Sequence, residues 1–92
     1  MRVTGRIASD EPAALAARAA RHFAHKVPVE EDGAVRRIET RFGRIELEPA
    51  GEDLILTLEG EVVEQLRALA VSHLERFARG APFHVRWDQA AL

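Results

Sequence analysis

Residues 38–58, IETRFGRIELEPAGEDLILTL, place apolar side chains at every second position. This period of two is typical of strands that are buried on one face. Gly43 and the cluster Pro49–Asp53 interrupt it, and glycine or a Pro–Gly cluster at such points favours a tight turn or a bulge. The segment therefore predicts a three-stranded meander with these side chains on its buried face: Ile38, Thr40, Phe42, Ile45, Leu47, Leu54, Leu56 and Leu58.

Both ends of the chain show the same period. Arg2–Ala8 alternates basic or polar residues with small or apolar ones, and Phe83–Trp87 alternates apolar with basic residues. Each segment predicts a strand beside the meander. The extended segment Val27–Glu31 leaves open one more short strand at an edge of the sheet.

The first helix is expected after Ser9–Pro12, with sequence SDEP. This run supplies an N-cap candidate, acidic residues for the first turn and a proline suited to that turn. The Ala-rich segment that follows predicts a helix to about Lys26, because Pro28 disfavours helical geometry at Val27.

A second, strongly amphipathic helix is expected over Glu61–Arg79 and is stopped by Gly80 and Pro82. Two such helices and a half-polar sheet predict an α+β two-layer sandwich. We expect an antiparallel or mixed sheet, both helices on one face, and the order β-α-β-β-β-α-β. Residues 1–92 are expected to form a single domain.

Length and composition exclude several classes of protein. The chain has 92 residues, no cysteine and a formal net charge of −2. It is too short for a (β/α)₈ barrel of about 250 residues or for a complete doubly wound dinucleotide-binding domain. Without cysteine it has no disulfide and no thiolate metal site. Because no apolar run approaches the ~18 residues of a membrane span and no signal peptide is evident, we expect a soluble, cytoplasmic protein.

The first helix is basic, since it contains no acidic residue after its first turn. On a helical wheel, Arg18, Arg21 and His25 lie opposite the apolar side, whereas His22 and Lys26 lie at its boundary. Such a surface favours an anion, because arginine and lysine pair with carboxylates or phosphates.

Two alternatives remain for these groups. His22 and His25 are three residues apart, so both imidazoles could reach one metal ion, although the neighbouring arginines would repel it. The simplest outcome is that the basic groups pair with the carboxylates of Glu30, Glu31 and Asp32 just downstream.

In the second helix, His73 falls among the apolar residues, close to Leu66 and Phe77 on the wheel. A buried imidazole needs a hydrogen-bond partner, and burial disfavours its charged form. The plain interpretation is a core histidine with a satisfied ring. The alternative is a histidine that points into a pocket between helix and sheet.

No other pattern indicates an enzymatic or nucleic-acid site. Ser9 and Ser72 are the only serines, and neither lies in a nucleophile-elbow motif. The glycines are scattered, so no phosphate-binding loop is formed. The outward positions of the strands lack the aromatic residues that stack bases.

Two segments, HFAHKVPVE at residues 22–30 and SHLERFA at residues 72–78, form a distinctive pair, together with a strand that ends at Trp87. From Thr4 to Trp87 the chain resembles a family of small bacterial proteins, domain of unknown function 2218. The positions that carry this resemblance are His22, Phe23, His25, Lys26, His73, Arg76 and Phe77.

The resemblance implies little about activity. Family members are often labelled dihydroxyheptenedioate aldolases, and they are associated with siderophore-interacting proteins, which implies an accessory role in iron uptake. Aldolases of that name resemble (β/α)₈ barrels with a divalent metal, and this chain is about a third of that length. The aldolase label is therefore implausible here.

We predict a non-catalytic binding or accessory module, linked by resemblance to siderophore and iron uptake, without a cofactor or a catalytic residue. The candidate residues for a ligand or anion are His22, His25, Lys26, His73 and Arg76. The alternatives are a metal- or haem-binding protein using His22, His25 and His73, and a small lyase-like enzyme using Lys26. The expected partner is a small anionic ligand or an iron-uptake protein, with no nucleic acid, no membrane and a homodimer as an option.

Overall fold

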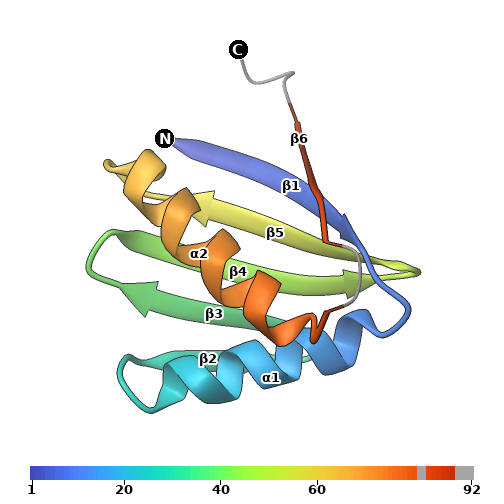
Figure 1. Ribbon diagram of the computed structural model, residues 1–92. Coiled ribbons are helices and arrows are strands. Elements are labelled where there is room, and N and C mark those ends of the chain that lie inside the picture. The colour runs from blue at the N-terminus through green and yellow to red at the C-terminus, as the bar shows by residue number, and fades with distance from the viewer. Residues whose placement is uncertain (81–82, 89–92) are drawn as a thin grey trace.

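The meander occupies the middle of a single antiparallel sheet (Figure 1), in a computed structural model that describes residues 1–80 and 83–88. Within these residues the elements are β1 (Arg2–Ala8), α1 (Pro12–Ala24), β2 (Val29–Asp32), β3 (Val35–Thr40), β4 (Gly43–Ala50), β5 (Asp53–Glu59), α2 (Val63–Phe77) and β6 (Val85–Trp87).

The described strands lie in the order β2-β3-β4-β5-β1-β6, and all neighbours are antiparallel. Both helices lie on the same face of the sheet (Figure 1), where they pack on its central strands. The predicted α+β two-layer sandwich is confirmed. The additional edge strand that the sequence left open is present as β2, so the order is β-α-β-β-β-β-α-β.

The strand pattern predicted for the meander is also confirmed. Ile38, Ile45 and Leu47 are buried, as are the three leucines of β5. Gly43 begins β4 with a φ of 137°, a conformation that suits glycine alone. Phe42 lies in the turn before it, outside the strands, and still packs partly against the core.

The two helices are shorter than the sequence predicts. α1 ends at Ala24, and the amides of Lys26 and Val27 both donate to the carbonyl of Phe23 in the turn that follows. Its N-cap is Glu11 rather than Ser9, whose hydroxyl instead accepts a hydrogen bond from the Glu11 amide.

At the other helix, α2 begins at Val63 and ends at Phe77, two residues inside each expected boundary. Gly80 follows with a φ of 82°, as a glycine after a helix commonly does. Pro82, the other expected stop, lies outside the described residues.

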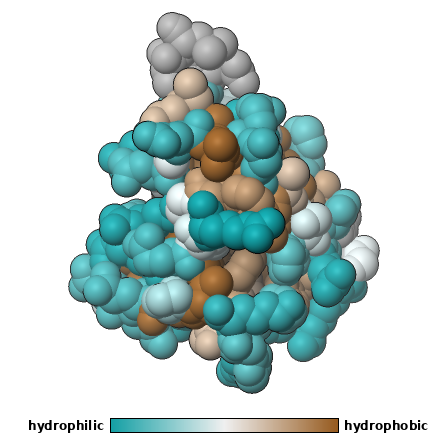
Figure 2. Space-filling view, turned by 90° about the vertical axis from the view of Figure 1, so that its left-hand side faces the viewer, coloured by the Kyte–Doolittle hydropathy of each residue, from teal (hydrophilic) through white to brown (hydrophobic). Residues whose placement is uncertain are grey.

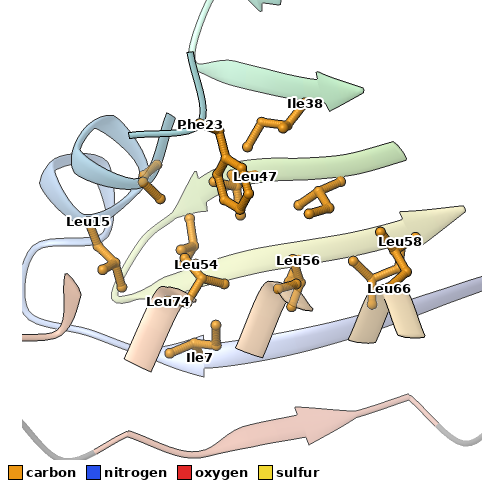
Figure 3. Packing of buried hydrophobic residues seen from close by; sticks show 14 of the residues in the cluster. Ile7, Leu15, Phe23, Ile38, Leu47, Leu54, Leu56, Leu58, Leu66 and Leu74 are labelled. Carbon is orange, nitrogen blue, oxygen red and sulfur yellow. The ribbon is translucent and has the colours of Figure 1, made fainter. Parts of the chain in front are cut away.

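Side chains from the sheet and from both helices meet in one core (Figure 3). Leu15 and Phe23 come from α1, and Leu66 and Leu74 come from α2. Burying these apolar groups stabilises the sandwich and fixes the two helices side by side on the sheet. The two helices are therefore held in a fixed geometry relative to each other. No helix among residues 1–80 and 83–88 is long and apolar enough to cross a membrane.

Candidate functional site

The packing of α1 against α2 brings His22 and His73 together. The two ring centroids lie 5.3 Å apart, and the His22 ring lies 5.2 Å from the ring of Phe77. Phe23 completes the group, with its ring 4.9 Å from that of His73. These four rings form one contiguous cluster at the seam between the helices.

Helical spacing explains why these residues share the seam. On α2, Arg76 and Phe77 follow His73 by three and four residues, so both lie on the same side of the helix as His73. His22 lies in the last turn of α1, and Lys26 follows in the turn after the helix. We call the group His22, His25, Lys26, His73 and Arg76 the basic corner.

His73 has the hydrogen-bond partner that the sequence analysis requires. A carbonyl oxygen can only accept, so the Nδ1–H of His73 donates to the Leu69 carbonyl, at 2.8 Å. The ring is half-buried, not enclosed in the core, because it lies at the edge of the apolar face of α2. With Nδ1 protonated, Nε2 of the neutral ring is left as an acceptor.

His22 is the member of the basic corner whose acid–base behaviour is most altered. Burial lowers the pKa of His22 below 6.5, and His73, Lys26, Arg76 and His25 lower it further by electrostatic repulsion. No carboxylate of the described residues is among the largest contributions to this shift. The potential at the corner is therefore positive and opposes additional positive charge.

The expectation that the basic groups of the first helix pair with the carboxylates just downstream is wrong. Glu30 lies opposite Arg37 and Glu31 lies opposite Arg36 in the antiparallel register of β2 and β3. Arg37 accordingly pairs with Glu30 and Asp32, at 3.2 and 3.3 Å, and Arg36 approaches Glu31 at 3.7 Å. Strand pairing thus supplies these carboxylates with nearer cations.

Lys26 and Arg76 are left without a carboxylate partner. Both side chains are exposed, and neither forms an ion pair within residues 1–80 and 83–88. His25, also exposed, takes no part in the ring cluster. The corner therefore presents uncompensated cations beside two imidazoles.

Arg18 differs from its expected place on the solvent side of α1. Its side chain is half-buried, and Nη2 donates to the carbonyl of Phe77 at 3.0 Å and to Glu11 at 3.2 Å. The last carbonyls of a helix have no partner within it, so a long cationic side chain on the neighbouring helix is well suited to bind one. The helical wheel could not show this, because it contains no neighbouring helix.

The geometry does not supply the donor set of a metal site. His22 and His73 approach each other, but no group of three histidine or acidic side chains that could hold a metal occurs among the described residues. A structural zinc ion takes four ligands and a catalytic one takes three from the protein. Lys26 is exposed, whereas a lysine that forms a Schiff base is normally desolvated.

Two surface hollows lie away from the basic corner, and the sequence patterns indicate neither. One of about 580 Å³ is bordered by the first half of α1, the end of β1, and by Ala78 and Phe83. Its polar border is mostly acidic, from Asp10, Glu11 and Glu52, with Arg18 as the single cation. A smaller hollow of about 130 Å³ lies on the strands β1, β4 and β5.

Comparison with solved structures finds the same fold in a bacterial protein. The NMR structure of PA4090 from Pseudomonas aeruginosa superposes with a TM-score of 0.75, covering 97% of this chain and 96% of that one. Sequence identity between the two is 22%, so the likeness concerns the fold alone. No curated protein matches the sequence.

A family model accounts for nearly the whole chain. It matches residues 4–88 and carries the description of an uncharacterized protein conserved in bacteria, DUF2218. That description names no aldolase and no other activity, so the label attached to some members finds no support here. The matched region includes all described elements of the sandwich except the first residues of β1. The chain belongs to the DUF2218 family of bacterial proteins.

Proposed function

We propose that this chain is a non-catalytic binding module that recognises an anion at the basic corner. The observation that carries the proposal is that neither Lys26 nor Arg76 pairs with a carboxylate of the described residues, while the acidic side chains at residues 30–32 pair with Arg36 and Arg37. Cations left exposed in this way attract carboxylates or phosphates.

The two imidazoles strengthen this interpretation. Protonation of His22 is opposed by His73 and by the cations Lys26 and Arg76. An anion at the corner would offset that repulsion, and a protonated imidazole would then add a further positive charge for it. The corner is thus suited to bind negative charge more strongly as the pH falls.

The proposal includes an accessory role in iron uptake, and only the family resemblance supports that part. The exposed cations Lys26 and Arg76 support the binding part of the role, because such groups pair with carboxylates and phosphates. A lyase reaction at Lys26 lacks the desolvated pocket that would activate its amine.

Titration with citrate tests the proposal. In heteronuclear NMR spectra, the amide signals of residues 22–26 and 73–77 should shift first and saturate. The double variant Lys26→Gln/Arg76→Gln should bind citrate about tenfold more weakly.

The matched control is Arg2→Gln/Arg86→Gln. It removes the same charge from β1 and β6, on the face of the sheet that the helices leave open. This variant should bind like the unmodified protein. Equal losses in both double variants would mean a general charge effect, and shifts confined to other regions would place the anion elsewhere.

A further inference from the structure

The seam between the helices at the basic corner is filled by side-chain rings. Phe23 and His73 lie 4.9 Å apart and His22 and Phe77 lie 5.2 Å apart, centroid to centroid. Neither of the two hollows described above includes a residue of the corner. An anion at the corner would therefore lie on the surface over the filled seam, whereas sites for small molecules are concave and bury most of the ligand.

The exposed charges of the corner come from both helices. His25 and Lys26 follow the end of α1, and Arg76 lies in the last turn of α2. The half-buried imidazoles of His22 and His73 lie at the seam. A partner that meets Lys26 and Arg76 together contacts both helices, and an extended chain with several carboxylates is suited to do so.

The remaining surface disfavours a nucleic acid. The chain carries a net charge of −2, and its segment 27–66 alone carries −7. On the open face of the sheet, Arg37 and Arg44 are already paired with Glu46 and Glu39. A nucleic acid carries a continuous line of phosphates and needs an extended basic surface, whereas an acidic protein segment can be limited to the few carboxylates that the corner accommodates.

A lipid surface is disfavoured as well. Among the described residues, the only large apolar side chains classed as exposed are Met1 and Val62, and neither belongs to the corner. On the face seen in Figure 2, hydrophilic side chains separate small apolar patches. Peripheral membrane binding normally combines basic residues with an apolar face that enters the bilayer, and this surface supplies no such face.

We infer that the occupant of the basic corner is an acidic, extended segment of another protein, which lies across the seam with carboxylates on Lys26 and Arg76. This inference rests on the proposed function and adds the class of partner. Open, cationic surfaces recognise acidic partners through complementary charge, which gives selectivity and fast association without an enclosed pocket.

The test compares a fluorescein-labelled glutamate-rich peptide with the same peptide carrying glutamine, by fluorescence anisotropy. The glutamate peptide should bind at least about tenfold more tightly than both the glutamine peptide and citrate. Its affinity should fall as salt is added, because exposed charges are screened. Lys26→Gln/Arg76→Gln should abolish the preference, and Arg2→Gln/Arg86→Gln should keep it.

The outcomes separate this inference from the proposed function. If citrate binds at the corner as tightly as the peptide, the partner class is wrong and the anion site stands. If neither binds, both fail. Tighter binding of a single-stranded oligonucleotide or of phosphatidylserine vesicles would overturn the inference in favour of that partner. A dimer of the unmodified protein that Lys26→Gln/Arg76→Gln dissociates, seen by light scattering, would overturn it in favour of a second copy.

Discussion

The imidazole of His22 and the imidazole of His73 face each other across two helices, with their centroids 5.3 Å apart. Neutral rings at this distance make a favourable contact, and two protonated rings repel each other. His73 is one cause of the lowered pKa of His22, so a charge on His22 is disfavoured at this contact. Stability and binding at the basic corner are therefore both linked to protons.

We expect the free energy of unfolding to decrease as the pH falls below about 6.5. The pKa of His22 is lowered from 6.5 in the folded chain, first by burial and then by the charges of His73, Lys26 and Arg76. The unfolded chain then binds more protons than the folded one between the lowered pKa and 6.5, so stability is complete above this range and is lost through it. Urea denaturation at a series of pH values measures the effect.

His22→Gln should flatten this pH dependence, because it removes the group that titrates differently in the two states. His84→Gln is the control, since it removes an exposed histidine on the segment that leads into β6. A pH profile that both variants change equally would contradict the assignment to His22.

The link between Arg18 and the end of α2 gives a second prediction. Arg18→Met keeps the aliphatic stem and removes the hydrogen bond to the Phe77 carbonyl, so it should lower the free energy of unfolding by about 1–3 kcal/mol. Arg21→Met is the control on the same helix, because Arg21 is exposed and has no ion pair in the described part of the chain. Equal denaturation midpoints for the two variants would show that the Arg18 hydrogen bond contributes nothing.

The fold was largely predictable because its signals are local. The period of two in residues 38–58 and the helical period of the two amphipathic segments each arise within one element, and each is confirmed by the burial of Ile45, Leu56 and Leu66. The helix ends were less predictable. They depend on how the chain leaves each helix, as in the turn where the amides of Lys26 and Val27 both bond to Phe23.

The sequence indicates candidate residues for a site but not their ion pairs. Helical spacing predicts His22 at the boundary of an apolar face and His73 within one, and the structure places the ring of His73 half-buried beside that of His22. Which carboxylate meets which cation depends on the register of β2 against β3, and this register assigns Glu30 to Arg37. A one-residue change of register would exchange the faces of these side chains, so charge order along the chain cannot determine the pairs.

The close approach of β6 to β1 gives a third prediction. A Cβ atom on Gly5 would lie 2.7 Å from Cγ1 of Val85 and 2.9 Å from the ring of Trp87, so Gly5→Ala should displace β6. We expect a loss of about 1–3 kcal/mol in stability from overpacking. Because Trp87 is the only tryptophan, its fluorescence should also shift to longer wavelength as the ring becomes exposed.

Thr4→Ser is the control for this variant. It changes the neighbouring residue of β1, and adjacent side chains of a strand point to opposite faces of the sheet. Its emission spectrum should match that of the unmodified protein. If Gly5→Ala leaves the Trp87 emission unchanged, β6 does not lie against Gly5.

Binding at the basic corner should take up protons near pH 6, which is the fourth prediction. The lowered pKa of His22 disfavours the charged ring in the free protein, and a bound carboxylate would favour it. Calorimetric titration with the glutamate-rich peptide, in two buffers of different ionisation enthalpy, measures the uptake directly. The apparent binding enthalpy should differ between buffers at pH 6 and agree at pH 8, where neither state of His22 holds a proton.

His22→Gln should reduce the difference at pH 6, and His84→Gln should retain it. Tight binding with the same enthalpy in both buffers at pH 6 would show that the peptide is held by Lys26 and Arg76 without the imidazoles.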